Sequence, residues 1–231
     1  MNEGFLLIDK PDGITSHDVV ARLRRITGIR RIGHAGTLDP FATGLLIVGV
    51  GRGATKNLGT MMAKEKIYEG TAVLGATSDT QDRTGEIILL PSPTWPSKNA
   101  LQETLTKFTG ALEQIPPMYS AKKIGGKKLY ELARKGLEVA RKPAHITIHE
   151  LALTSYTPPH FSFMVRCTTG TYVRTLANDI GAALGVGAYL ETLRRTAIGE
   201  LRVKDAKKLD DLTSDNWQSF LITPHLDSPD H

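Results

Sequence analysis

Apolar residues in this chain of 231 residues follow two different spacings, and the two kinds of segment do not alternate regularly. Apolar residues three or four positions apart predict helices at 17–27, 97–108, 171–184 and 189–195. Short apolar or alternating runs predict strands at 4–9, 45–50, 67–74, 145–156 and 161–167. Because the pattern contains no series of βαβ units, it favours an α+β fold.

The composition excludes several classes of protein. Cys167 is the single cysteine, so neither an internal disulfide nor a multi-cysteine zinc site can form, and we expect no metal. The longest apolar run, near residues 44–50, is far shorter than the ~20 residues that span a bilayer, which predicts no membrane association. The N-terminus lacks the basic and apolar regions of a secretory signal. We therefore expect a cytoplasmic protein.

Basic residues are concentrated in two segments, although the net charge of the whole chain is only +5. Segment 22–31 has five arginines and no acid, and segment 122–142 has eight basic residues and two acids. The C-terminal residues 210–231 instead contain five aspartates and no Lys or Arg. A single basic run could be a solvated helix face, but two separate clusters favour a nucleic-acid partner.

Residues 33–46 combine a histidine, a carboxylate and three glycines in a stretch without periodicity. Loops of this kind often carry function. The alternative is a purely structural turn, in which Asp39-Pro40 starts the turn and the glycines supply positive φ angles. Composition alone does not decide between the two.

The same loop closely resembles the catalytic motif of the TruB family of tRNA pseudouridine synthases. The resemblance extends over about residues 4–200, in the order in which the family has its motifs. The further matching segments are 4–16 with its Lys10-Pro11 pair, 75–82, 116–123, 126–136, 167–174 and 193–196.

The resemblance implies the pseudouridine synthase catalytic fold, with a mixed and mainly antiparallel central sheet flanked by helices and loops. It assigns residues 1–200 to the catalytic domain. Within that domain, residues from about 115 to 145 form a basic insertion that grips tRNA. Residues 201–231 are then an acidic tail, too short for the C-terminal PUA domain of many family members. A natural short form and a truncation are both compatible with this length.

The implied activity is conversion of uridine 55, in the T-loop of tRNA, to pseudouridine. The reaction breaks the bond from N1 to the ribose and joins C5 to the same carbon, so it needs no cofactor. An ionised carboxylate can act as the nucleophile, and the resemblance assigns that role to Asp39. Attack on C1′, attack on C6 and a glycal route all remain open.

The resemblance also assigns roles to the residues around that carboxylate. Arg174 is the cation that offsets the desolvation of Asp39, a task for which Arg suits better than Lys. Tyr68 stacks on the target base, and Tyr172 and Leu193 line the pocket. Without the resemblance, Leu193 would be a packing residue on a helix face.

The target base must be turned out of the RNA before a side chain can reach it. The resemblance gives His34 the role of filling the gap that the base leaves. Lys10 is expected to support the motif loop or to contact backbone phosphates. Asp79 and Asp82 lie in a matching segment but have no evident proton-transfer task, and we expect them to order their loop by hydrogen bonds.

The expected partner is tRNA, held at its T-stem and loop by the basic segment 122–142, with the arginines at 22–31 extending the surface. We expect a monomer with no obligate protein partner. Two other hypotheses remain: an RNA-binding or RNA-folding protein without the chemistry, and a relative that acts on another RNA.

Overall fold

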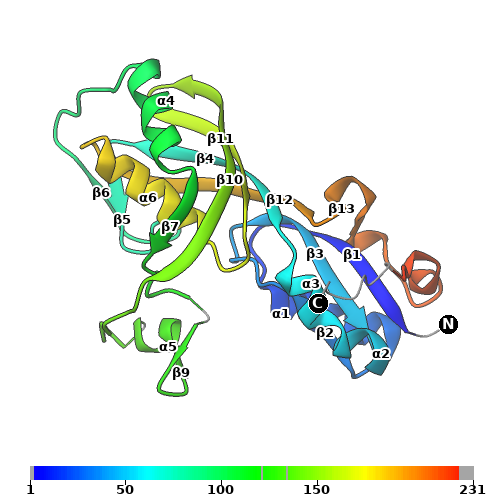
Figure 1. Ribbon diagram of the computed structural model, residues 1–231. Coiled ribbons are helices and arrows are strands. Elements are labelled where there is room, and N and C mark those ends of the chain that lie inside the picture. The colour runs from blue at the N-terminus through cyan, green and yellow to red at the C-terminus, as the bar shows by residue number, and fades with distance from the viewer. Residues whose placement is uncertain (1–2, 121, 134, 224–231) are drawn as a thin grey trace. The chain divides into compact units, whose positions relative to one another are not determined.

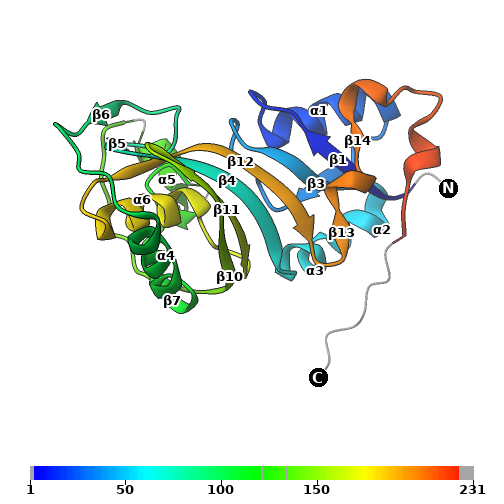
Figure 2. The same cartoon turned by 90° about the horizontal axis from the view of Figure 1, so that it is seen from above.

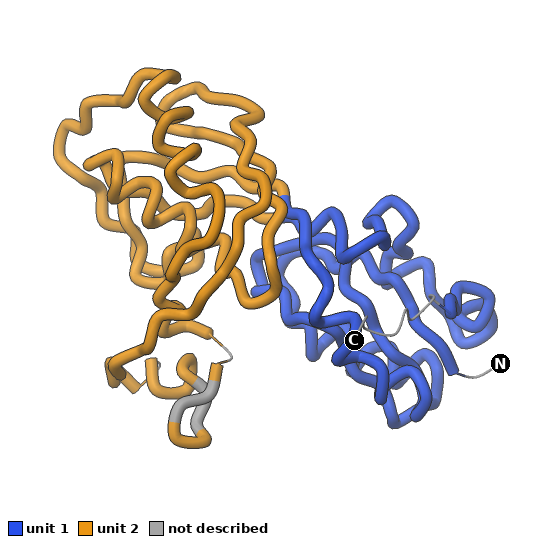
Figure 3. Tube along the Cα trace, viewed as in Figure 1, with its two compact units in different colours: residues 1–68, 194–231 blue, residues 69–193 orange. Residues whose placement is uncertain are grey.

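The computed structural model describes residues 3–120, 122–133 and 135–223. The chain forms two compact units, unit 1 (residues 1–68 and 194–231) and unit 2 (residues 69–193), which Figure 3 shows in different colours. The chain passes into unit 2 within strand β4 (Lys66–Leu74) and returns within strand β12 (Ala188–Ile198).

Unit 1 is built on the antiparallel pair β1 (Gly4–Lys10) and β3 (Thr43–Val50), aligned from Gly4 opposite Val50 to Lys10 opposite Gly44. Strand β2 (Ile32–Ala35) also pairs with β3, and β14 (Lys207–Lys208) pairs with β1 in parallel. The C-terminal part of β12 runs parallel to β3, through Arg194 opposite Thr43 and Arg195 opposite Gly44. The order in this unit is therefore β14-β1-β3-β12.

Helix α1 (Ser16–Thr27) begins where the sequence predicts. Thr15 and Asp18 form a capping box, in which the side chain of each residue bonds to the backbone N–H of the other. The helix ends at Gly28, whose φ of 71° is the left-handed conformation that glycine adopts without strain. Its buried face includes Val19, Val20 and Leu23.

Successive side chains of β1 point to opposite sides, and both sides are covered. Leu6 and Ile8 pack in the core that contains α1, whereas Phe5 and Leu7 pack in a second core beside the short helices α2 (Gly51–Lys56) and α3 (Leu58–Ala63). This explains why the strand is an uninterrupted apolar run rather than an alternating one.

The residues after β12 also fold onto unit 1. They form β13 (Leu201–Arg202) and three 3-10 helices, η1 (Val203–Asp205), η2 (Leu209–Asp211) and η3 (Trp217–Phe220). Leu209, Leu212 and Trp217 are buried in the same core as α1. Residues 201–223, the part of the expected acidic tail that the structure describes, are therefore packed against unit 1. The boundary of the catalytic domain at residue 200 stays a prediction.

Unit 2 contains the strand order β4-β11-β10-β7, with β11 (His160–Cys167), β10 (Ala144–Thr157) and β7 (Gly110–Gln114). Helix α4 (Lys98–Lys107) lies against β10 and against α6 (Val173–Ala183), as Figure 1 shows. Two small hairpins complete the unit: β5 (Ala76–Ser78) with β6 (Ile87–Leu89), and β8 (Lys123–Ile124) with β9 (Lys127–Lys128). Helix α5 (Leu129–Ala133) follows the second hairpin.

The predicted helix at 189–195 is wrong, because these residues belong to strand β12. Leu190 and Leu193 are both buried and three positions apart, which imitates helical spacing. In the strand this spacing arises because the in-and-out alternation slips by one residue near Thr192. The other predicted helices and all predicted strands are present, and the expected α+β class is confirmed. The longest described helix, α1, has 12 residues and is too short to cross a bilayer.

Candidate active site

Asp39 lies in unit 1 on the loop that connects β2 to β3, which we call the Asp39 loop (residues 36–42). Its side chain is half-buried. The backbone turns at this residue, because the Asp39 carbonyl accepts a hydrogen bond from the N–H of Ala42 at 3.1 Å. Leu38 and Phe41, on either side of the turn, are buried and anchor it in the core. The fold thus brings a carboxylate to a fixed turn at the protein surface.

Ser16, the first residue of α1, holds one side of this turn. Its Oγ accepts a hydrogen bond from the Leu38 N–H at 2.9 Å and donates one to the Leu38 carbonyl at 3.2 Å. Ser16 is only 1% exposed, so water does not compete for these bonds. This contact could not be predicted from the sequence, because nothing local relates Ser16 to residue 38.

Lys10 holds the other side of the turn from the end of β1. It is fully buried, and its Nζ donates hydrogen bonds to the carbonyls of Pro11 (2.8 Å), Ile14 (2.7 Å) and Pro40 (3.1 Å). Burial lowers the pKa of Lys10 to about 8, and the charges of Asp12 and Asp39 oppose that shift. The carboxylate of Asp39 and the ammonium group of Lys10 therefore attract each other.

Of the two roles expected for Lys10, the structure therefore supports the first, which is to hold the motif loop. The alternative role, a direct contact with an RNA phosphate, stays a prediction. The support for the first role is that Lys10 is fully buried and that its Nζ bonds to three backbone carbonyls.

Arg195, on β12, ties the start of the Asp39 loop to β3. Its Nε donates to the Leu45 carbonyl at 2.7 Å and its Nη2 to the Gly36 carbonyl at 3.0 Å, and the residue is 1% exposed. Gly44 allows β12 this close, because a Cβ at position 44 would overlap the Arg195 carbonyl oxygen. The sequence analysis matched the motif 193–196 but selected only Leu193 from it.

His34 lies on β2, opposite Val48 of β3, and is half-buried. Its ring meets that of His17 edge to face, with centroids 5.5 Å apart. Burial, followed by the charges of His17 and Arg195, lowers the pKa of His34 to about 4. Among the described residues, its buried Nδ1 has no hydrogen-bond partner. A neutral ring of this kind suits stacking better than a charge contact with phosphate.

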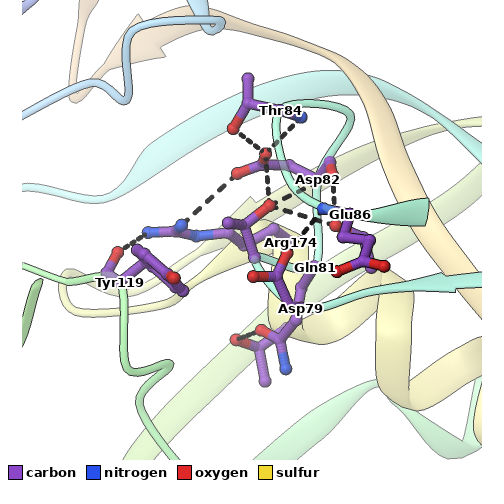
Figure 4. A network of polar contacts seen from close by, with 10 residues as sticks. Asp79, Gln81, Asp82, Thr84, Glu86, Tyr119 and Arg174 are labelled. Carbon is purple, nitrogen blue, oxygen red and sulfur yellow. Dashed lines mark hydrogen bonds and ion pairs between the residues drawn. The ribbon is translucent and has the colours of Figure 1, made fainter. Parts of the chain in front are cut away.

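Arg174 lies in unit 2, in the first turn of α6, and is 4% exposed. Its Nη1 is 3.4 Å from Oδ2 of Asp82, and its Nη2 donates to the Tyr119 carbonyl at 2.6 Å, as Figure 4 shows. The sequence analysis missed this ion pair with Asp82. Because Asp39 belongs to unit 1, the expected pairing of Arg174 with Asp39 stays a prediction.

The loop that carries Asp82 is ordered by carboxylates, which confirms the expectation for both aspartates. Oδ1 of Asp82 accepts hydrogen bonds from the Thr80 hydroxyl and from both the N–H and hydroxyl of Thr84, at 2.6–2.9 Å. Oδ1 of Asp79 accepts from the Glu86 N–H at 2.8 Å. Asp82 thereby presents its second oxygen to Arg174 from a fixed position (Figure 4).

The three other predicted site residues are divided between the two units. Tyr68 ends the first segment of unit 1 on β4 and is 8% exposed. Leu193 is the last residue of unit 2, on β12, and is 7% exposed. Tyr172 precedes α6, and its backbone N–H and carbonyl both bond to the buried side chain of Gln114. The structure brings Lys10 and Asp39 together in unit 1, and Tyr172 and Arg174 in unit 2.

The basic insertion forms the β8–β9 hairpin and α5 in unit 2. Lys122, Lys135 and Lys142 are exposed. Arg134 lies outside the described residues, and so do the side chains of Lys127 and Lys128. Across the described part of the chain, no three His, Cys, Asp or Glu side chains are placed to hold a metal ion.

Comparisons with known proteins agree along nearly the whole chain. A family model for the TruB family pseudouridylate synthase (N terminal domain) matches residues 24–173, and one for the tRNA pseudouridylate synthase B C-terminal domain matches residues 174–224. The chain is 48% identical over 207 residues to tRNA pseudouridine synthase B of Syntrophotalea carbinolica, covering 90% of this chain and 67% of that protein. The protein of the same name from Opitutus terrae is 49% identical over 209 residues, covering 90% and 86%.

Solved structures agree with these relatives. A chain in the crystal structure of a Cbf5-Nop10-Gar1 complex matches over 94% of this chain with a TM-score of 0.72 and 27% identity. The chain spans only 56% of that larger chain. A family model matches 150 residues of this chain, and nearly half of the aligned positions are identical in these relatives. The chain therefore belongs to the TruB family of pseudouridylate synthases.

Proposed function

We propose that this chain isomerises uridine 55, in the T-loop of tRNA, to pseudouridine, with Asp39 as the catalytic residue. Isomerisation of uridine in tRNA is the activity of the family to which the chain belongs. The position in the tRNA and the roles of the individual residues are the parts that we propose.

The reaction breaks the bond between N1 and C1′ and forms a bond between C5 and C1′. N1 gains a proton and C5 loses one, so the reaction is redox-neutral and uses only groups of the uridine, water and the protein. An ionised carboxylate near C1′ and C6 can hold the nucleotide while the uracil turns. In this proposal Arg174 balances that charge, Tyr68 stacks on the base, and Tyr172 and Leu193 line the pocket.

The observation that carries the proposal is the way the Asp39 loop is held in unit 1. Lys10, Ser16 and Arg195 reach it from β1, α1 and β12, and all three are buried. A surface turn does not need three buried polar anchors to be stable. A catalytic carboxylate does need a fixed position, because small displacements lower the rate steeply.

The test is release of tritium from tRNA labelled at C5 of uridine, together with mass spectrometry of the T-loop fragment. Asp39→Asn should lower the rate at least ~10³-fold, because the amide cannot act as a nucleophile. The matched control is Asp211→Asn, which removes an exposed carboxylate from the same unit and should keep full activity. An active Asp39→Asn enzyme would show that another group does the chemistry.

The same assay separates the remaining hypotheses. A protein that only binds or folds RNA would bind unmodified tRNA without releasing tritium. A relative that acts on another RNA would leave uridine 55 unmodified in the mass spectrum. We further propose that the chain acts as a monomer without a protein partner, so the purified chain alone should be active and should elute at monomer mass in light scattering.

A further inference from the structure

Two adjoining hollows lie on unit 1 and share Arg22. The larger one, about 510 Å³, is lined by Arg22, Arg25, Ile26 and Ser214. The smaller one, about 210 Å³, also has Arg194 and Lys208 in its lining, with Asp9 and Asp210. We call the two hollows together the basic cleft, after the basic residues Arg22, Arg25, Arg194 and Lys208 in their lining. Lys10 also lines the smaller hollow, but its three protons bond to backbone carbonyls.

The four basic residues that name the cleft come from three elements of unit 1. Arg22 and Arg25 are three positions apart on α1 and therefore share one helix face. Lys208 ends β14, and Arg194 lies on β12. Figure 2 shows the segment after β14 running back beside α1, where Asp210 pairs with Arg22. The cleft is therefore an assembled surface and not a local run of basic sequence.

The charges of the cleft are only partly balanced. Arg194 makes two hydrogen bonds to the carboxylate of Asp9, at 3.0 and 2.7 Å. Arg22 pairs with Asp210, but the side chains are 41% and 83% exposed, and ion pairs that exposed contribute little to stability. Among the residues that the structure describes, Arg25 and Lys208 have no acidic partner. A net positive charge therefore remains.

We propose that the basic cleft binds the ribose-phosphate backbone of the RNA substrate outside the reaction site, an inference that rests on the proposed function. Guanidinium groups bind phosphate oxygens with two parallel hydrogen bonds, and Arg22 and Arg25 are placed to do so from one helix face. A phosphate then displaces Asp210 from Arg22. Most of the residues that line the two hollows are charged or polar, which fits phosphates better than a small molecule, whose sites are mostly apolar.

The test is the affinity for unmodified tRNA, measured by fluorescence anisotropy at several salt concentrations. The double variant Arg25→Glu and Lys208→Glu should raise the Kd for tRNA about 10-fold. The slope of log Kd against log salt concentration should also become smaller, by about one for each phosphate that the variant no longer neutralises. Asp210→Asn should lower the Kd, because it removes the carboxylate that competes for Arg22. The matched control is Arg52→Glu, an exposed charge reversal on α2 of the same unit, which should leave the Kd unchanged.

The outcomes separate this inference from the proposed function. If the double variant keeps its melting temperature and binds tRNA as tightly as the unmodified protein, the basic cleft does not bind RNA. The same conclusion follows if Arg52→Glu weakens binding equally, because the loss would then reflect net charge and not the cleft. Failure of the proposed function is a different result, namely tight tRNA binding by the original chain without tritium release.

Discussion

Lys10 illustrates how a buried charge can be tolerated and used. An isolated ammonium group in the interior is costly, because it loses its water. In this protein each of its protons reaches a backbone carbonyl, at 2.7–3.1 Å, and one of these belongs to Pro40 beside the proposed catalytic residue. The side chain thus joins the end of β1, the start of α1 and the Asp39 loop.

Replacing Lys10 by methionine should lower the free energy of unfolding by about 2–4 kcal/mol, because three carbonyls lose a charged donor while the volume is kept. The rate of pseudouridine formation should fall as well, since Pro40 loses its anchor. Urea unfolding and tritium release measure the two effects, with the exposed Lys56→Met as control. A Lys10→Met protein as stable as the original would contradict the structural role.

His34 predicts a pH dependence of stability. Its pKa is about 4 in the folded chain and near 6.5 in the unfolded chain. Between these values the unfolded chain binds more protons, so the contribution of His34 to stability is present above pH 6.5 and is lost as the pH falls towards 4. His34→Phe should not show this decrease.

Urea unfolding at pH 7 and pH 5 measures the effect. The original protein should lose more stability between pH 7 and pH 5 than the His34→Phe variant does. The control is His145→Phe, which removes an exposed histidine of unit 2 and should lose as much stability as the original. Equal losses in the original and in His34→Phe would mean that His34 titrates normally and is not desolvated.

The basic insertion is the element whose proposed role depends on charge alone. Its exposed lysines are described at positions 122, 135 and 142, while Arg134 and the side chains of Lys127 and Lys128 are not described. The triple change of Lys122, Lys135 and Lys142 to Glu should weaken tRNA binding at least ~10-fold at low salt, and the difference should shrink as salt rises.

A single-residue control for this experiment is Lys98→Glu, on an exposed position in the first turn of α4, where a negative charge is compatible with the helix dipole. Binding should be unchanged in this variant. If the triple variant binds tRNA with the original salt dependence, the insertion does not grip the RNA.

The chain leaves unit 1 once and returns to it, so the ends of the sequence belong to the same unit. The second family model begins at residue 174 in unit 2 and ends at residue 224, beyond the last described residue of unit 1. A division of the sequence into consecutive domains therefore does not coincide with the compact units of the fold. The C-terminal residues contribute Leu209, Leu212 and Trp217 to the core of α1.

Trp217→Ala should lower the free energy of unfolding by about 3–5 kcal/mol, because it removes a large side chain that is 3% exposed and leaves a cavity. Chemical unfolding followed by circular dichroism measures it. Trp95→Ala is the control, since that tryptophan is 41% exposed. A small effect at Trp217 would mean that the segment after β14 adds nothing to the stability of unit 1.

Local patterns in the sequence determined most of the elements. The capping residues Thr15 and Ser97, the apolar periods and the positions of glycine are properties of neighbouring residues, and the helices at 17–27, 97–108 and 171–184 follow from them. The motif around Asp39 likewise identified the candidate carboxylate. The strand at 188–198 was misjudged, because a slip in strand alternation has the same spacing as one helical turn.

Only the tertiary structure decided how the candidate residues are held. Ser16 and Leu38, Lys10 and Pro40, and Arg195 and Gly36 are 22, 30 and 159 positions apart in the chain. No local rule relates them, because hydrogen bonds between distant residues depend on which strands become neighbours. The same physical reason explains why the charge pattern pointed to the arginines of α1 but not to Arg194 and Lys208, which β12 and β14 contribute to the basic cleft.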